Sequence, residues 1–346
     1  MNYAVGSVPY SLAVSDFNRD GKRDLVVANV DSNTISILLG NGDGTFAAAV
    51  NRESPAGPDS VTVGDFNGDG RSDLALANWY ANSVSIRLGN GDGTFSASVS
   101  YTVGMNPTSV AVIDFNGDGK SDLAAANFNA HTISILLGNG SGGFAAAATF
   151  SAGTQPSSLA IDDFNRDGSG DLAVANYTSA NVTIFLGNAC SNNGTFGSAA
   201  QYTVGSLPRS VAAADLNGNG TNDLVVTNSA SNNVSVLLGI GGGAFGAAST
   251  FATGSTPLAV AIADFDRNGT KDLAVANYDS NNVSILLGNG TGSFAPALNY
   301  TAGTKPTSVA VDDFNGDGKS DLAVADYSRG TSRSCSGMEM GRSPRL

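Results

Sequence analysis

One pattern of oxygen-bearing side chains recurs along the chain. The nine-residue phrase Asp-Phe-Asn-x-Asp-Gly-x-x-Asp, or a close variant, begins at Asp16, Asp65, Asp114, Asp163, Asp215, Asp264 and Asp313. Carboxylate or amide oxygens occupy positions 1, 3, 5 and 9, and position 7 can offer a backbone carbonyl. Ca²⁺ takes about six to eight hard oxygen ligands, and alternate positions of a tight loop point them inward, as in the first half of an EF-hand loop. Glycine at position 6 permits the sharp turn.

The pattern therefore predicts up to seven Ca²⁺ sites, one in each loop. With no Glu at position 12, we expect Asp at position 9 to be the bidentate ligand that closes each site; Mg²⁺ is less suited to so many protein ligands. The predicted metal residues, with position 7 acting through its carbonyl, are Asp16, Asn18, Asp20, Lys22, Asp24, Asp65, Asn67, Asp69, Arg71, Asp73, Asp114, Asn116, Asp118, Lys120, Asp122, Asp163, Asn165, Asp167, Ser169, Asp171, Asp215, Asn217, Asn219, Thr221, Asp223, Asp264, Asp266, Asn268, Thr270, Asp272, Asp313, Asn315, Asp317, Lys319 and Asp321.

The copies are not equal. Six loops keep three Asp, whereas the loop that begins at Asp215 has only two, so we expect it to be the weakest site. The alternative is a metal-free turn, because Asp, Asn and Gly also favour turns. Metal is favoured, since three carboxylates within nine residues repel one another unless a cation compensates them.

Composition limits the classes of function. The 346 residues carry a formal net charge of −13, and 28 of the 30 acidic residues are Asp. A strongly acidic chain argues against nucleic-acid binding, which needs Lys and Arg. No apolar run approaches the roughly 20 residues of a membrane span. The first residues lack the basic and apolar regions of a signal peptide, and Cys190 and Cys335 have no zinc-site spacing.

The spacing of the loops predicts the architecture. Successive copies are 49 residues apart, except for 52 between the fourth and fifth. Each repeat contains short β-branched and aliphatic runs, such as 109–112, 122–127 and 132–137, and a fourth segment that includes Phe144. Four strands in a repeat of roughly 50 residues describe a propeller blade, whereas a β-solenoid would use a shorter period. We predict an all-β, seven-bladed β-propeller with four-stranded antiparallel blades.

The repeat resembles a known family. The loops of the form Asp-Phe-Asn-Gly-Asp-Gly-Lys-Ser-Asp, the following Leu-Ala-Val-Ala-Asn and the segment Leu-Leu-Gly-Asn-Gly-x-Gly-x-Phe are similar to FG-GAP or VCBS-type repeats of bacterial surface proteins, which are related to the integrin α-subunit propeller. The resemblance covers residues 1–329. It implies a seven-bladed propeller with Ca²⁺ in the loop between the first and second strands of a blade.

The end of the chain departs from the repeat. Residues 330–346 match nothing earlier. Codons for Met338, Glu339 and Met340 shifted by one base can encode the missing Asn-Gly-Asp-Gly turn, so we expect a frameshift and a disordered tail. The seventh blade would then be incomplete and lack its third strand, while residues 2–5 supply part of its outer strand.

Ligand candidates lie in the turns between second and third strands. These turns carry Trp79, Tyr80, Phe128, Tyr177, Tyr278 and Tyr327. Strand alternation predicts that they share one face with the proline-containing connections between blades and lie opposite the metal loops. The aromatic side chains could stack on a sugar or protein ligand, and the alternative is packing between blades. Because Trp79, Tyr80 and Arg87 depart most from the repeat, we predict them as ligand residues.

These features predict an extracellular or cell-surface calcium-binding module rather than an enzyme, because extracellular Ca²⁺ modules work at high calcium. Its partner would be a carbohydrate, as in a lectin, or a protein in adhesion. A polysaccharide lyase or hydrolase and a structural spacer of a larger protein remain alternatives, since fold alone does not decide function. Near-identical blades and a lone His131 without a catalytic partner favour binding.

Overall fold

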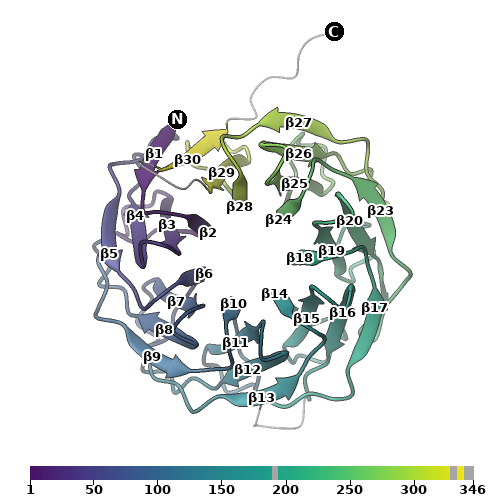
Figure 1. Cartoon of the computed structure of the whole chain (residues 1–346), viewed down its shortest axis with the longest axis horizontal. Coiled ribbons are helices and arrows are strands. Elements are labelled where there is room, and N and C mark those ends of the chain that lie inside the picture. The colour runs from purple at the N-terminus through teal and green to yellow at the C-terminus, as the bar shows by residue number, and fades with distance from the viewer. Residues whose placement is uncertain (189–193, 328–332, 339–346) are drawn as a thin grey trace.

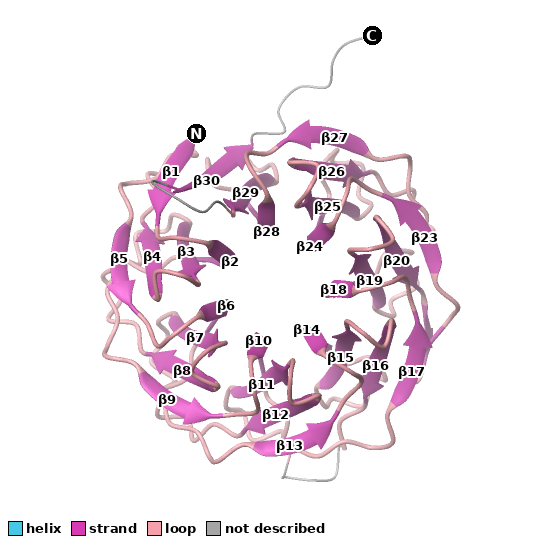
Figure 2. Ribbon diagram, in the orientation of Figure 1, coloured by secondary structure: helices cyan, strands magenta, loops and turns pink. Residues whose placement is uncertain are grey.

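The computed structural model describes residues 1–188, 194–327 and 333–338. Strands arranged in a ring make up the regular structure (Figures 1 and 2). These described residues contain no helix, and hence none that is long and apolar enough to cross a bilayer.

Six four-stranded antiparallel blades are each built from one continuous stretch of chain. Their strands are β2 (Pro9–Ser15), β3 (Asp24–Asn29), β4 (Thr34–Leu38) and β5 (Val50–Glu53); β6 (Pro58–Gly64), β7 (Asp73–Asn78), β8 (Ser83–Arg87) and β9 (Val99–Thr102); β10 (Pro107–Ile113), β11 (Asp122–Asn127), β12 (Thr132–Leu136) and β13 (Ala148–Ser151); β14 (Pro156–Asp162), β15 (Asp171–Asn176), β16 (Asn181–Phe185) and β17 (Ala200–Thr203); β18 (Pro208–Ala214), β19 (Asp223–Asn228), β20 (Asn233–Leu237) and β23 (Ser249–Ala252); β24 (Pro257–Ala263), β25 (Asp272–Asn277), β26 (Asn282–Leu286) and β27 (Leu298–Thr301). A small hairpin, β21 (Gly239–Gly241) and β22 (Ala244–Phe245), lies between β20 and β23.

A further sheet joins the two ends of the described chain, and we call it the composite sheet. Its strands are β28 (Pro306–Asp312), β29 (Asp321–Asp326), β30 (Arg333–Met338) and β1 (Asn2–Val5). The first strand of each sheet lies nearest the centre of the ring (Figure 1). Each of these inner strands packs against the next, and β28 packs against β2, so the ring is closed.

The composite sheet corrects part of the sequence prediction. Six blades, rather than the expected seven, consist of contiguous chain. The expectation that the last repeat lacks its third strand is wrong, because β30 pairs antiparallel with both β29 and β1. Pairing requires only backbone N–H and C=O groups, so a segment unlike the repeat can still complete a ladder. Residues 333–338 of the expected tail form β30, while 328–332 and 339–346 lie outside the described residues.

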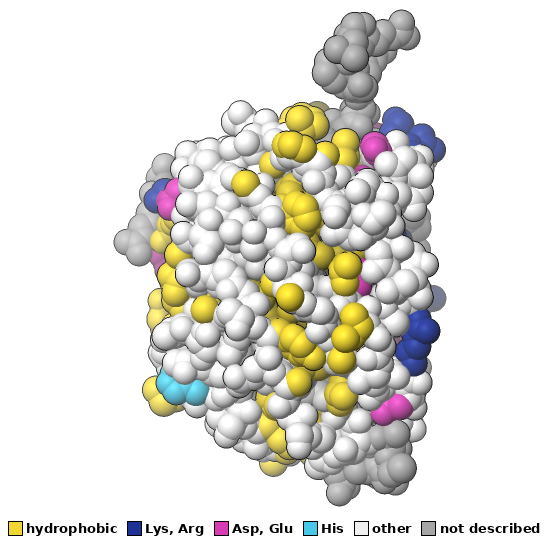
Figure 3. All heavy atoms as spheres, turned by 90° about the vertical axis from the view of Figure 1, so that its right-hand side faces the viewer, with side chains coloured by type: hydrophobic (Ala, Val, Ile, Leu, Met, Phe, Trp, Pro, Cys, Tyr) yellow, Lys and Arg dark blue, Asp and Glu magenta, His cyan; other side chains and the backbone are white. Residues whose placement is uncertain are grey.

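Apolar side chains on both faces of the second strands form the core. Val26 and Ala28 of β3 pack toward the second blade, where they meet Val61. Leu25 and Val27 point the other way and pack toward the composite sheet. All residues of β3 are buried because neighbouring blades cover both of its faces, which explains a continuous apolar run instead of alternation. The outermost strands are exposed, and hydrophobic side chains form a band across the rim (Figure 3).

Candidate metal loops and the opposite face

Strand register places the acidic loops and the aromatic turns at opposite ends of each blade. In the first blade Ser15 pairs with Asp24 beside the acidic loop, whereas Pro9 pairs with Asn29 at the other end. The other blades repeat this register. One face of the ring therefore carries the acidic loops, and the other carries the proline connections and aromatic turns, as predicted.

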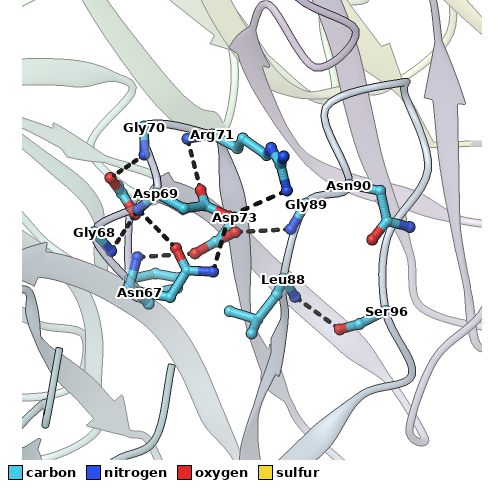
Figure 4. Close-up of polar contacts among 12 residues, drawn as sticks. Asn67, Gly68, Asp69, Gly70, Arg71, Asp73, Leu88, Gly89, Asn90 and Ser96 are labelled. Carbon is cyan, nitrogen blue, oxygen red and sulfur yellow. Dashed lines mark hydrogen bonds and ion pairs between the residues drawn. The ribbon is translucent and has the colours of Figure 1, made fainter. Parts of the chain in front are cut away.

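The carboxylate at position 1 organises each loop. In the second blade, Asp65 Oδ1 accepts a hydrogen bond from Gly68 N at 2.8 Å, and Oδ2 accepts one from Gly70 N at 2.9 Å (Figure 4). Gly68 and Gly70 have φ of 72° and 74°, a backbone conformation that favours glycine. The carboxylate thus stabilises the turn that brings positions 3 and 5 toward position 1.

The carboxylate at position 5 lies at the exposed end of the loop. Asp69 Oδ1 accepts from Arg71 N at 2.9 Å, and Oδ2 lies 3.4 Å from Arg71 Nη1 (Figure 4). Asp118 pairs with Lys120 in the same way at 3.0 Å. Because these pairs are solvent-exposed, they contribute little to stability, and the oxygens stay accessible to an ion.

The carboxylate at position 9 has a role that sequence reasoning missed. Asp73 is fully buried; its Oδ1 accepts from Gly89 N at 2.7 Å and its Oδ2 from Phe66 N at 2.8 Å (Figure 4). It therefore ties the loop to the turn after the third strand. Gly89 is needed there, because a Cβ at this residue would lie 2.2 Å from the carbonyl oxygen of Ser72.

All seven position-9 carboxylates are buried and accept from the backbone amide of the residue at position 2. Burial, reinforced by the charges of Asp114 and Asp118, raises the pKa of Asp122 to about 6 against the lowering effect of its amide donors. An ionised carboxylate has about four lone-pair sites, so two amide donors leave capacity for a cation. Bidentate metal coordination at this position stays a prediction.

The sixth loop brings its carboxylates closest together. Oxygens of Asp264, Asp266 and Asp272 lie within 4.8 Å of one another, a grouping that is unique among the described residues. Asp at position 3 in place of Asn accounts for the difference. Hard anionic oxygens at this spacing fit a Ca²⁺ ion.

The fifth loop is closed by amide and hydroxyl groups. Asn219 Oδ1 accepts from Thr221 N at 2.7 Å, and Asn219 Nδ2 donates to the carbonyl of Gly239 at 3.4 Å. A carboxylate stands at this position in five other loops. The prediction of a weakest site here rests on that difference.

The acidic loops also connect neighbouring blades. Phe17, at position 2 of the first loop, packs edge-on against Phe95 of the second blade, with ring centroids 5.5 Å apart. Gly93 N donates to the carbonyl of Phe17 at 3.0 Å. Phe314 and Phe46 make the same contact between the composite sheet and the first blade, at 5.6 Å. The recurring Phe residues therefore pack between blades, and loop geometry is thereby linked to blade packing.

Aromatic side chains on the opposite face form pairs between blades. Phe128 lies 5.5 Å from Trp79 and 5.7 Å from Tyr177, and Tyr278 lies 5.5 Å from Tyr327. These contacts favour the packing interpretation. The rings are nevertheless only half-buried, so their edges and faces remain partly available for a ligand.

The predicted ligand residues do not lie together. Tyr80 is 61% exposed next to Trp79 on the aromatic face. Arg87 ends β8 at the metal-loop end, where it pairs with Leu74, and its guanidinium donates to backbone carbonyls of Ser96, at 3.0 Å, and Glu53. Through these hydrogen bonds Arg87 stabilises the blade edge. It lies apart from Trp79 and Tyr80, because the five-residue strand β8 separates it from the aromatic turn.

His131 performs a structural role. Its Nδ1 accepts from Gln155 N at 3.1 Å, and its backbone has φ of 58°. Asn82 accepts in the same way from Asn106 N at 2.8 Å, with φ of 49°. The histidine replaces an Asn that supports the connection between blades.

A closed ring of four-stranded sheets, with an acidic loop between the first and second strand of each repeat, defines a β-propeller of repeats with candidate metal loops. FG-GAP-like repeats match residues 16–76, 65–125, 114–174, 163–226, 215–275 and 266–324. The chain therefore belongs to the FG-GAP-like repeat family.

Solved structures share the architecture at low sequence identity. They include BBS1N in complex with ARL6DN (TM-score 0.67, 14% identity, 98% of this chain and 95% of that chain covered). An Agrocybe aegerita lectin that recognises non-reducing terminal N-acetylglucosamine has a TM-score of 0.58 and 19% identity, with 85% and 80% covered. Virginiamycin B lyase from Staphylococcus aureus has a TM-score of 0.64 and 14% identity, with 94% and 95% covered. These likenesses show the fold alone, and no curated protein sequence matches the chain.

Proposed function

We propose that this protein is a calcium-stabilised, extracellular binding module, a propeller of seven blades when the composite sheet is counted, that presents its ligand face opposite the metal loops. The observation that carries the proposal is the sixth loop, where three carboxylates lie within 4.8 Å of one another. The other loops repeat the same backbone, so each is a candidate for the same ion.

Calcium would act on stability rather than on chemistry. An ion held by positions 1, 3, 5 and 9 would fix a loop whose position-2 Phe packs on the adjacent blade. Anything that binds the folded state alone stabilises it in proportion to the logarithm of ligand concentration. Calcium would therefore raise the stability of the whole ring.

The ligand would be a carbohydrate or a protein that contacts the aromatic face. Half-buried aromatic side chains, with exposed Tyr80 beside them, offer flat apolar surfaces with polar edges. Such groups can stack on sugar rings or act as anchor residues in a protein interface. A non-enzymatic role is supported by His131, which is engaged in a structural hydrogen bond.

Thermal unfolding with Ca²⁺, Mg²⁺ or a chelator tests the metal proposal. We expect Ca²⁺ to raise the melting temperature by more than 5 °C over the chelated protein, and Mg²⁺ to do so much less. An unchanged melting temperature after chelation would refute calcium stabilisation. Binding to a glycan array, with product analysis of bound oligosaccharides, tests the second part: cleavage would identify an enzyme, and absence of any glycan or protein ligand would identify a spacer.

A further inference from the structure

One position of the inner strands lies close to the centre of the ring. It directly follows the proline that begins each inner strand. Thr108 Oγ1 donates to the carbonyl of Pro156 in the next blade at 3.2 Å, and Ser157 Oγ donates to that of Pro208 at 2.8 Å. A hydroxyl here joins neighbouring inner strands on the aromatic face.

Four blades place a larger or charged side chain at this position, namely Tyr10, Asp59, Arg209 and Leu258, and the first three of these are polar. Burial and the Asp59 carboxylate raise the pKa of Tyr10 to about 12, and the Arg209 guanidinium acts in the opposite direction. Tyr10 and Arg209 belong to β2 and β18, which are separated by other blades on both sides of the ring. The inner strands surround the centre of the ring (Figure 1), and side chains at this position in β10 and β14 reach the next inner strand, so Tyr10, Asp59 and Arg209 lie beside the ring axis.

Two tyrosines from the aromatic turns join this cluster. The hydroxyls of Tyr177 and Tyr278 also act on the titration of Tyr10. The guanidinium of Arg209 lies over the Tyr177 ring, with Cζ 4.3 Å from the centroid. Stacking of this kind holds the guanidinium in place while leaving its edge free for hydrogen bonds.

Neither charged group of the cluster has a direct counter-ion. The five ion pairs of the described chain all lie in or beside the metal loops and involve neither Asp59 nor Arg209. Arg209 Nε is buried without a hydrogen-bond partner within the described residues. A buried donor without a partner is costly, so this group is suited to an acceptor supplied by a ligand.

We propose that Tyr10, Asp59, Tyr177, Arg209 and Tyr278 form an axial binding site for a sugar acid, such as a uronate at the end of a polysaccharide. The ligand carboxylate would accept hydrogen bonds from the Arg209 guanidinium, a charge-assisted pair of high specificity. Ligand hydroxyls would donate to the Asp59 carboxyl and exchange hydrogen bonds with the tyrosine hydroxyls. The site deepens the proposed function and rests on it, because it names the carbohydrate that the aromatic face would bind.

The arrangement favours a sugar acid over the two nearest alternatives. A neutral sugar would leave the stacked guanidinium without an acceptor. A zwitterionic amino acid would satisfy Arg209 and Asp59 but would leave three tyrosine hydroxyls without matching polar groups. A uronate supplies a carboxylate together with several hydroxyls on one rigid ring.

Calorimetric titration of the full chain in Ca²⁺ with glucuronate, glucose and glycine tests this site. We expect saturable binding of glucuronate and at least about tenfold weaker binding of glucose and glycine, since charged hydrogen bonds typically account for such a factor. Arg209→Gln should weaken glucuronate binding about tenfold or more. The glucuronate affinity of Arg209→Lys should lie between those of the wild type and Arg209→Gln, because lysine keeps the charge but lacks the planar guanidinium.

Two controls separate a specific loss from a general one. Arg52→Gln removes the same charge from exposed strand β5 and should leave glucuronate binding unchanged. Unaltered melting temperatures would show that Arg209→Gln remains folded. Equal binding of glucose and glucuronate, preferred binding of glycine, no binding of glucuronate, or full affinity in Arg209→Gln would each overturn the axial site. Glycan-array binding that persists in Arg209→Gln would leave the proposed binding function standing.

Discussion

Asp73 accepts hydrogen bonds from the backbone amides of both Phe66 and Gly89, at 2.8 and 2.7 Å. It so joins the start of its loop to the turn at Gly89, 16 residues after Asp73 itself. Because the carboxylate is fully buried, water does not replace these bonds when the side chain is removed. The residue expected to close a metal site therefore also holds the blade together without metal.

Asp73→Ala should destabilise the protein even in chelator. It leaves two buried N–H groups without acceptors, at a cost of about 3 kcal/mol or more in the free energy of unfolding. Asp69→Asn changes a carboxylate at the exposed end of the same loop and should cost little in chelator. Urea unfolding of both variants measures the difference; equal stabilities would show that the backbone bonds of Asp73 are unimportant.

Asn219→Asp should strengthen the fifth loop as a calcium site. The substitution supplies a third carboxylate at position 5, where Asn219 now accepts from the amide of Thr221. We expect about tenfold tighter binding of one calcium ion, consistent with the dependence of affinity on ligand charge. Isothermal calorimetry and bound-calcium analysis measure it. Asn188→Asp, outside the acidic loops, serves as the control for added charge, and an equal change in both variants would argue against a site.

Phe66→Ala should weaken the contact between the second and third blades. Phe66 is almost fully buried and packs edge-on against Phe144, with centroids 5.5 Å apart. Truncation of a buried Phe costs about 3–5 kcal/mol. A double-mutant cycle with Phe144→Ala should give a coupling of about 0.5–1.5 kcal/mol. Strict additivity of the two substitutions would contradict direct coupling between these rings.

Asp326→Asn should stabilise the protein at neutral and higher pH. Six blades have a buried Asn at this position, and Asn29 Nδ2 donates to Ser36 Oγ at 2.9 Å. Asp326 is buried, and neither of its oxygens has a partner within the described residues. Burial raises its pKa from 3.8 to about 7.

The pH dependence of this effect follows from the raised pKa. The unfolded chain ionises first, so wild-type stability should fall as pH rises from about 4 to about 7 and then level off, by up to about 4 kcal/mol from this group. Asp326→Asn should remove that part of the fall. Melting temperatures from pH 4 to pH 8 should therefore diverge with rising pH, and a constant difference across this range would exclude titration of Asp326 as the cause.

Most of the fold was predictable because each repeat carries the same pattern of apolar strand residues and acidic loop residues. The nearly constant spacing of the acidic loops revealed the repeat, and apolar runs such as 24–29 identified strands that are buried on both faces. The two faces followed from strand alternation. The candidate metal-ligating positions were proposed from the alternate oxygen-bearing residues of each loop.

Other features depend on contacts between distant segments. Residues 333–338 share no pattern with the repeat, yet their backbone completes a ladder, and backbone pairing leaves little trace in side-chain sequence. The double acceptor role of Asp73 depends on Gly89, whose approach the loop alone does not reveal. The axial cluster was missed because Tyr10, Asp59 and Arg209 are brought together only by closure of the ring.

The composite sheet determines how the ring would respond to tension between its ends. Asn2 pairs with Ser336 and Val5 with Arg333, so the two ends of the described chain leave β1 and β30 on the same side of the pair. A force that pulls Asn2 away from Met338 would load these hydrogen bonds one after another, as in a zipper, rather than all at once in shear. The ring would open at this seam at low force while the six continuous blades stayed intact, so a tether anchored at both ends would yield there first.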